Sequence, residues 1–187
     1  MSSFEWEILN SELIFEAKPW LSIKKETIKL PDGKVVNDFY QIEQPDYVEI
    51  VALNKAKLIQ GLWHYKHGVR KEHLGLPAGY LEQGEKPLAA AQRELLEECG
   101  LCSDTWLKLG EFVLEGNRTQ AKGHFYMALD CKTSSVQLPS DDMEESRMDW
   151  LSIEAWLEHI ANGNVAVIGA ATAILLADRE LKSRGEV

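Results

Sequence analysis

Alternating apolar and polar residues in the first half of the chain predict extended strands. Residues 20–43 contain two such runs on either side of a Pro-Asp-Gly turn at 31–33, which predicts an antiparallel hairpin. Two further runs, 47–53 and 57–65, lie on either side of a short polar turn and predict a second pair of strands. Residues 66–75 carry several basic side chains and are expected to form a loop.

The second half of the chain mixes helical patterns with strand patterns. Residues 87–99 predict a helix, because Pro87 suits a first helical turn and Gly100 suits the position just past the end. The remaining patterns predict strands at 107–115, 123–130 and 147–151, and helices at 152–163 and 166–181. Ser152 is expected to cap the first of these two helices. These elements predict an α/β protein, with a mixed sheet that carries helices on its faces.

Composition narrows the function before any motif is considered. The 187 residues are 45% hydrophobic and 27% charged, which is ordinary for a soluble globular protein. A net charge of −10 disfavours nucleic acid as a partner, since its phosphates would be repelled. No apolar run reaches the roughly 20 residues that span a bilayer, and the start of the chain lacks the pattern of a secretory signal. The odd count of three cysteines fits a reducing compartment, so we expect a cytoplasmic protein with no nucleic-acid or membrane partner.

Carboxylates crowd one face of the helix at 87–99. At about 100° per residue, Glu94, Glu97 and Glu98 fall within roughly 100° of one another, away from the arc that contains Leu95. A solvated acidic face is one interpretation. However, these glutamates lie in the C-terminal half of the helix, where its dipole disfavours negative charge. A hard cation, Mg²⁺ or Mn²⁺, would remove the repulsion and would let an acidic protein bind a phosphate ester or anhydride.

The spacing of these glutamates resembles the Nudix box at every defined position. The matching residues are Gly79, Glu85, Arg93, Glu94, Leu95, Glu97, Glu98 and Gly100. The resemblance implies a Nudix α/β/α sandwich with a mixed sheet at 45–187, preceded by an N-terminal β-hairpin extension at 1–44. It also implies that water attacks a diphosphate linked to another moiety, with the help of a divalent metal.

The resemblance assigns the metal site to four residues. Glu94 and Glu98 are expected as metal ligands, and Glu97 as a third, partly shared ligand with a catalytic role. The backbone carbonyl of Ala78, just before the box, is expected to complete the set.

Other box residues are expected to support these ligands. Arg93 should orient the carboxylates through charge-assisted hydrogen bonds. Glu85 should brace the loop before the helix, and Gly79 and Gly100 should serve backbone geometry.

Weaker features resemble the branch of the family that hydrolyses ADP-ribose and nucleoside diphosphate sugars to a nucleoside monophosphate and a sugar phosphate. They are the N-terminal hairpin, the Leu-Pro-Ala-Gly run that enters the box and the His-Tyr-Lys run at 64–66. Lys66, where that branch often has arginine, is expected to bind substrate. Trp20 is expected either to stack on the base or to pack. The chain departs from the branch at Gly75, where an acidic residue is frequent, and at Gly116, where proline is frequent.

Alternatives to this substrate class remain open. Another nucleotide of the family, such as a dinucleotide or a damaged nucleoside triphosphate, would suit the same box. A nucleotide-sensing module on the same fold is the non-enzyme alternative, but such a protein should have lost a metal carboxylate, and this chain keeps all three.

The resemblance also implies a general base in the acidic loop before the strand at 147–151. Glu144 occupies the position most similar to the loop glutamate of the family. Asp141, Asp142 and Glu145 are its neighbours and the alternative bases, and an acidic solvated loop without a catalytic role is the other interpretation.

We also expect a homodimer. A two-stranded ribbon is marginal in water by itself, so the N-terminal hairpin needs a surface to pack on.

Overall fold

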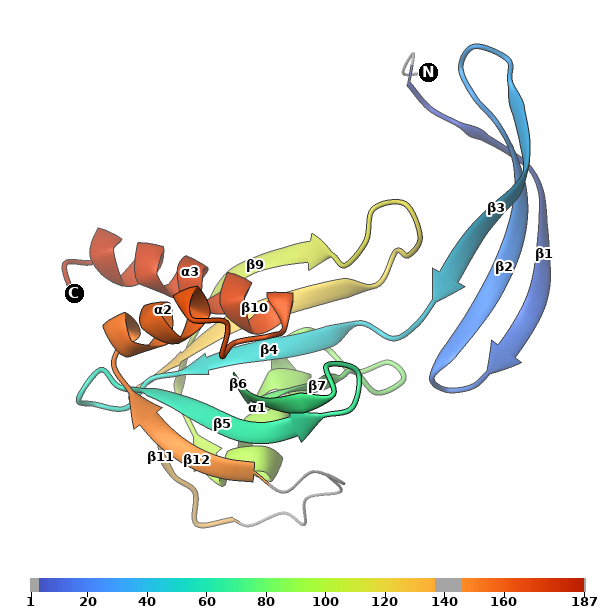
Figure 1. The fold of residues 1–187 in the computed structure, drawn as a ribbon. Helices are drawn as coiled ribbons and strands as arrows, with labels where there is room; N and C mark the ends of the chain where they lie inside the picture. The colour runs from blue at the N-terminus through green and yellow to red at the C-terminus, as the bar shows by residue number, and fades with distance from the viewer. Residues whose placement is uncertain (1–3, 137–145, 187) are drawn as a thin grey trace. The chain divides into compact units, whose positions relative to one another are not determined.

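A computed structural model of the chain describes residues 4–136 and 146–186. The chain divides into two compact units. The first comprises the residues up to 46 together with 112–122, and the second comprises 47–111 and the residues from 123 onward. Figure 1 labels the elements of both units.

The first unit is built on a three-stranded antiparallel sheet in the order β1-β2-β3. Its strands are β1 (Glu7–Ala17), β2 (Leu21–Lys29) and β3 (Val35–Glu43). The β2–β3 pair is the predicted hairpin, and Gly33 turns the chain at φ 88°. Strand β1 was not predicted, so the extension has three strands instead of the expected two. Register shifts between Ile8 and Asn10 and between Leu13 and Phe15 break the alternation that would have indicated this strand.

Residues 112–122 complete the first unit. The backbone N–H of Ile42 donates to the carbonyl of Arg118 at 2.6 Å, and the Gln41 side chain donates to the Asn117 carbonyl at 2.9 Å. The second of these bonds joins residues 76 positions apart in the sequence. The unit is therefore closed by a segment that follows the box.

Two sheets form the framework of the second unit. One is ordered β7-β4-β10-β9 and the other β12-β5-β6, and a short pair joins β11 to β8. The strands are β4 (Tyr47–Ala52), β5 (Ile59–Lys66), β6 (Lys71–Gly75), β7 (Ala78–Tyr80), β8 (Leu101–Cys102), β9 (Thr105–Val113), β10 (Lys122–Leu129), β11 (Lys132–Thr133) and β12 (Ser146–Leu151). Because β4 is parallel to β10 and antiparallel to β7, the first of these sheets is mixed, as predicted.

Two expectations about this unit are corrected. Strands β4 and β5 do not form a hairpin: they meet at an isolated bridge between Leu53 and Ile59 and then enter different sheets. Both strands are largely buried on both faces, so each is covered on both sides within its own sheet. The expected loop at 66–75 contains β6, whose inner end is buried although its outer end is charged.

Helices cover both faces of the mixed sheet. The three helices are α1 (Pro87–Cys99), α2 (Ile153–Ala161) and α3 (Ile168–Ser183). Helix α1 packs on one face of β4 and α3 on the other (Figure 1). Buried apolar residues on the α1 side include Ile50 and Leu95, and those on the α3 side include Val51, Trp156 and Ile174. This α/β/α layering confirms the predicted fold class.

The ends of the helices follow the expected capping chemistry in part. Ser152 caps α2, since its hydroxyl accepts the Ala155 N–H at 3.2 Å. Within the described residues, no helix is both long enough and apolar enough to cross a membrane.

Candidate active site

The box glutamates are positioned by α1, whose ends and buried face follow from the sequence. Pro87 is its first residue, and Gly100 ends it in the left-handed conformation at φ 63°. Ala91 and Leu95 are completely buried against the sheet. The helix is therefore fixed in rotation, and its carboxylates lie beside the strand that precedes the box.

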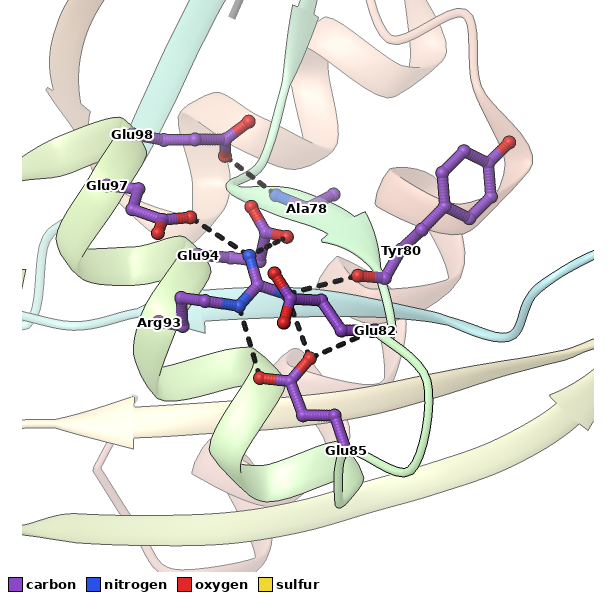
Figure 2. A network of polar contacts seen from close by, with 8 residues as sticks. All are labelled: Ala78, Tyr80, Glu82, Glu85, Arg93, Glu94, Glu97 and Glu98. Carbon is purple, nitrogen blue, oxygen red and sulfur yellow. Dashed lines mark hydrogen bonds and ion pairs between the residues drawn. The ribbon is translucent and has the colours of Figure 1, made fainter. Parts of the chain in front are cut away.

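Arg93 is the centre of a network of polar contacts (Figure 2). Its Nε and Nη2 donate to the two carboxylate oxygens of Glu85 at 3.1 and 3.0 Å. Its Nη1 donates to Oε1 of Glu94 at 2.7 Å and to Oε2 of Glu97 at 2.9 Å. Its Nη2 also reaches the carbonyl of Tyr80 at 3.1 Å. A lysine has no such fork, so only arginine can hold three carboxylates in this arrangement.

The charges of the network reinforce one another. Hydrogen bonding to Arg93 lowers the pKa of Glu85, and the bond to Glu85 is the largest cause of a raised pKa at Arg93. Glu85 also accepts the Glu82 N–H at 3.0 Å. It therefore ties the loop before α1 to the helix.

A glycine is needed at position 79 because a side chain would not fit there, and not because of the backbone conformation. A Cβ at this position would lie 2.0 Å from Oε1 of Glu94 and 2.1 Å from its Cδ. Glu94 itself is only 9% exposed, so its carboxylate has little room to move. The sheet register pairs Gly79 with Val48, whose side chain is buried in the α1-side cluster. Any side chain at position 79 would therefore displace Glu94.

The last glutamate of the box meets the main chain just before it. The Ala78 N–H donates to Oε2 of Glu98 at 2.9 Å (Figure 2). The expected ligands, the carboxylates of Glu94, Glu97 and Glu98 and the Ala78 carbonyl, would make an all-oxygen donor set, which suits Mg²⁺ or Mn²⁺. The space beside Gly79 also fits a ligand carboxylate at Glu94. In residues 4–136 and 146–186, no three acidic, histidine or cysteine side chains converge on one point. Arg93 engages two of the glutamates and Ala78 engages the third.

Three other expected site residues have different outcomes. Lys66 lies at the end of β5 in the second unit, and its charge lowers the pKa of the Glu49 carboxyl against the larger effect of burial. Trp20 lies in the turn between β1 and β2 of the first unit and is 67% exposed. Glu144 lies outside the described residues, as do its alternatives Asp141, Asp142 and Glu145.

Sequence reasoning missed a buried carboxyl next to Ala78. Glu49 is the register partner of Ala78 on β4 and is 4% exposed. Burial raises the pKa of Glu49 to about 8. A Cβ at Gly169 of α3 would lie 2.7 Å from its Oε2, so this glycine makes room for the carboxyl. The signal in the sequence is one charged residue within the apolar run 47–53.

Sequence reasoning also missed a pair of buried histidines beside Gly75. His64 on β5 and His73 on β6 are cross-strand partners, with ring centroids 4.9 Å apart. A Cβ at Gly75 would lie 2.8 Å from Nε2 of His64 and 3.3 Å from Cε1 of His73. The Nδ1 of His73 lies 3.1 Å from the Leu74 carbonyl, which can only accept, so this nitrogen carries a proton. Gly75 thus gives up a side chain to make room for two imidazoles.

Comparisons with known proteins agree with this geometry. The NUDIX domain model matches residues 46–179, and the model of the nucleoside diphosphate sugar hydrolase N-terminal domain matches residues 6–42. An ADP-ribose pyrophosphatase of Mycobacterium tuberculosis is 26% identical over 94% of this chain and 84% of its own length. An ADP-ribose pyrophosphatase of Bacillus subtilis is 25% identical over 93% of each chain.

A solved structure shows the same fold. The crystal structure of an ADP compounds hydrolase superposes with a TM-score of 0.87 at 20% identity, covering 98% of this chain and 97% of the other. The resemblance of the box is confirmed by a domain match that covers more than half of the chain and includes every box residue. The chain therefore belongs to the NUDIX family of hydrolases.

Proposed function

We propose that the chain hydrolyses the diphosphate linkage of ADP-ribose or a nucleotide sugar, giving a nucleoside monophosphate and a sugar phosphate. The observation that carries the proposal is the complete carboxylate network around Arg93, with Ala78 and Gly79 against it. The match of residues 6–42 to the N-terminal domain of nucleoside diphosphate sugar hydrolases supports this substrate class over others in the family.

Glu94, Glu97, Glu98 and the carbonyl of Ala78 are the residues that would hold Mg²⁺ or Mn²⁺. When bound, the ion supplies Lewis-acid activation of water and offsets the charge of the diphosphate. Arg93 holds Glu94 and Glu97 on one side of α1, and the Ala78 N–H holds Glu98. Its hydrogen bonds to Glu94 and Glu97 would compete with an ion for the same carboxylate oxygens. Gly79 keeps the space for Glu94 open.

Substrate binding is assigned to residues outside the box. Lys66 offers a point charge at the end of β5, which suits a phosphate or a sugar hydroxyl. Trp20 is exposed and offers an apolar face on which a base can stack. We divide the chain into the N-terminal extension at 1–44 and the hydrolase domain at 45–187. The odd count of three cysteines supports a cytoplasmic location.

Glu144 is proposed as the general base. The box carboxylates are engaged as ligands in this scheme, so the proton of the attacking water needs another acceptor. The acidic loop before β12 supplies that acceptor, with Asp142 and Glu145 as the alternatives.

The active form is proposed to be a homodimer that uses the first unit. Every residue of β1 except its last is exposed, although the strand carries Ile8, Leu9, Leu13, Ile14 and Phe15. A monomer rarely leaves such a strand uncovered, because its apolar side chains and its free edge both favour association. A groove lined by Trp6, Ile14 and Phe39 in the same unit adds to this surface. A second copy of the chain is the occupant we propose.

A panel of nucleoside diphosphate compounds tests the proposed function. The protein is incubated with Mg²⁺ and each compound, and the products are identified by mass. Adenosine monophosphate with ribose 5-phosphate, or a nucleoside monophosphate with a sugar phosphate, is the expected pair. Preferential cleavage of a dinucleotide or a nucleoside triphosphate would replace the proposal with the alternative substrate class.

A further inference from the structure

The box contains one aromatic side chain, and that side chain is exposed. Tyr80 follows Gly79 directly and is the only aromatic residue between Gly79 and Leu101. It is 53% exposed. Among the aromatic residues that the structure describes in the second unit, only Tyr65 is exposed to a similar extent, at 49%. An exposed ring within a substrate site offers a surface on which a planar group can stack.

The backbone of Tyr80 faces the box along the outer edge of β7. The Pro77 carbonyl accepts an N–H of β4 at 2.9 Å and therefore points into the sheet. Successive residues of a strand direct their N–H and C=O groups to alternate sides, so those of Ala78 and Tyr80 point outward. Accordingly, the Ala78 N–H donates to Glu98 at 2.9 Å, and the Tyr80 carbonyl accepts Nη2 of Arg93 at 3.1 Å (Figure 2). The expected metal ligand, the Ala78 carbonyl, belongs to the same outer edge.

The ring of Tyr80 is a short distance along β7 from this edge site. Residues two apart in a strand lie about 6 to 7 Å from each other, and their side chains share one face. Ala78 and Tyr80 are such a pair, whereas Gly79 between them faces Glu94. Figure 2 shows the ring of Tyr80 directed away from the carboxylates. A ligand whose diphosphate is bound at the outer edge can therefore pass around β7 and place its next planar group on this ring.

The packing around Tyr80 fixes its backbone and leaves its ring uncovered. Its cross-strand partner is Tyr47, whose hydroxyl lies 2.8 Å from the place of a Cβ on Gly169 in α3. The Tyr47 ring also meets Phe125 edge-on, with centroids 6.1 Å apart. Tyr47 is thus turned toward α3, while the Tyr80 carbonyl is bonded to Arg93. A ring on a backbone that is already ordered loses less freedom when it binds a ligand.

We propose that the ring of Tyr80 stacks on the base of the nucleotide substrate. The inference rests on the proposed hydrolase function and names a residue that determines which diphosphates are bound. Every base has a planar face, so stacking on an aromatic side chain is tolerant of base identity. Tyr80 should therefore favour diphosphates that carry a nucleoside over those that do not, without selecting one base.

Steady-state kinetics with ADP-ribose and Mg²⁺ tests the contact. Tyr80→Ala removes the ring and should raise KM by about tenfold with kcat changed by less than about twofold, since stacking on the base holds substrate and transition state equally. Tyr80→Phe keeps the ring and should stay within about twofold of the wild-type KM. An unchanged KM in Tyr80→Ala would overturn the inference. So would equal losses in the two variants, because the hydroxyl would then be the group that matters.

The matched control is Tyr65→Ala, which removes a tyrosine of similar exposure from β5 of the same unit. Its KM should stay within about twofold of the wild type. Trp20→Ala removes the other ring that is available to a base. A tenfold rise in KM for Trp20→Ala together with an unchanged KM for Tyr80→Ala would assign the stacking to Trp20 and overturn the inference.

Binding of the two expected products, measured by calorimetry with Mg²⁺, separates failure of this inference from failure of the proposed function. Tyr80→Ala should bind adenosine monophosphate about tenfold more weakly than the wild type and ribose 5-phosphate equally well, whether or not the protein hydrolyses ADP-ribose. Equal binding of adenosine monophosphate by both proteins, or none by the wild type, would overturn the inference. Equal weakening for both ligands would also overturn it, because Tyr80 would then contact the sugar phosphate and not the base.

Discussion

Helix α1 in the second unit and strand β1 in the first unit differ in how far their apolar side chains are buried. On α1, Ala91 and Leu95 are completely buried, and Glu94 and Glu97 share one arginine. On β1, apolar side chains such as Leu13 and Phe15 remain about half exposed, at 51% and 53%. The difference separates two requirements of the enzyme. The proposed metal site is held by contacts within residues 78–98, whereas the exposed apolar side chains of β1 are the surface that we propose to bind a second copy of the chain.

Removing one carboxylate from the box should have the largest effect. Glu98→Gln deletes a charged ligand while keeping the size of the side chain and an acceptor for the Ala78 N–H. We expect kcat to fall by about 10³-fold or more, because metal-assisted hydrolysis depends on the ion. Chelation of the wild type with EDTA should have the same effect, and Mg²⁺ or Mn²⁺ should restore activity.

Circular dichroism and light scattering provide the control for this variant. Both should match the wild type, since the box does not build the surface of β1. Full activity of the wild type in EDTA would refute the metal assignment.

The second prediction concerns the loop base. Glu144→Gln should lower kcat by about 10²- to 10⁴-fold with KM nearly unchanged, because a general base contributes that much to the chemical step. Asp142→Asn and Glu145→Gln are the neighbouring controls. If one of these loses activity while Glu144→Gln keeps it, the assignment is off by register. If none of the three matters, a box glutamate is the base.

A charged residue on β1 tests the dimer surface proposed for the first unit. Leu13→Lys should shift the protein from dimer to monomer in light scattering at micromolar concentration, because a buried cation at an apolar interface is unfavourable. Leu175→Lys on α3 is the matched control, since that leucine is 54% exposed, and it should leave the dimer intact. A wild type that is monomeric under these conditions would contradict the proposed role of the first unit. So would a protein truncated by residues 1–40 that stays soluble and active.

Glu49 is a buried carboxyl of the second unit that lies outside the box. Its substitution is expected to have the smallest effect of the four. Its folded pKa of about 8 lies above the ordinary 4.5, so the folded state holds a proton that the unfolded state releases. The stability from this group is fully present below about pH 4.5 and is lost as pH rises through 8. Glu49→Gln should therefore raise Tm relative to the wild type more at pH 8.5 than at pH 5. The measurement is thermal unfolding in EDTA, and a pH-independent difference in Tm would show that Glu49 is not protonated in the folded state.

The sequence predicted the features that depend on neighbours along the chain. The box, the ends of α1 at Pro87 and Gly100, and the Ser152 cap all follow from local chemistry, and the structure contains each of them. The turn at Gly33 is of the same kind.

The sequence could not predict features that arise from register between distant strands. Strand β1 was missed because its bulges break the alternation of apolar residues. The position of Glu49 beside Ala78 follows from the register of β4 and β7, and that of His64 beside His73 from the register of β5 and β6. In the sequence, Gly75 was only a departure from the acidic residue that is frequent in the family branch. The structure shows that a side chain at this position would collide with two imidazoles.

Because the chain is synthesised from its N-terminus, the first unit cannot be completed until residues 112–122 have been made. The Ala78–Glu98 contact joins residues 20 positions apart, whereas the Gln41–Asn117 contact spans 76. Short loops close faster, so we expect the box to assemble while the first unit still lacks its closing segment. As the chain leaves the ribosome, β1, β2 and β3 emerge first but wait for residues 112–122. During that interval Gln41 and Ile42 lack their closing partners, so the first unit is incomplete and more exposed to aggregation and to chaperones.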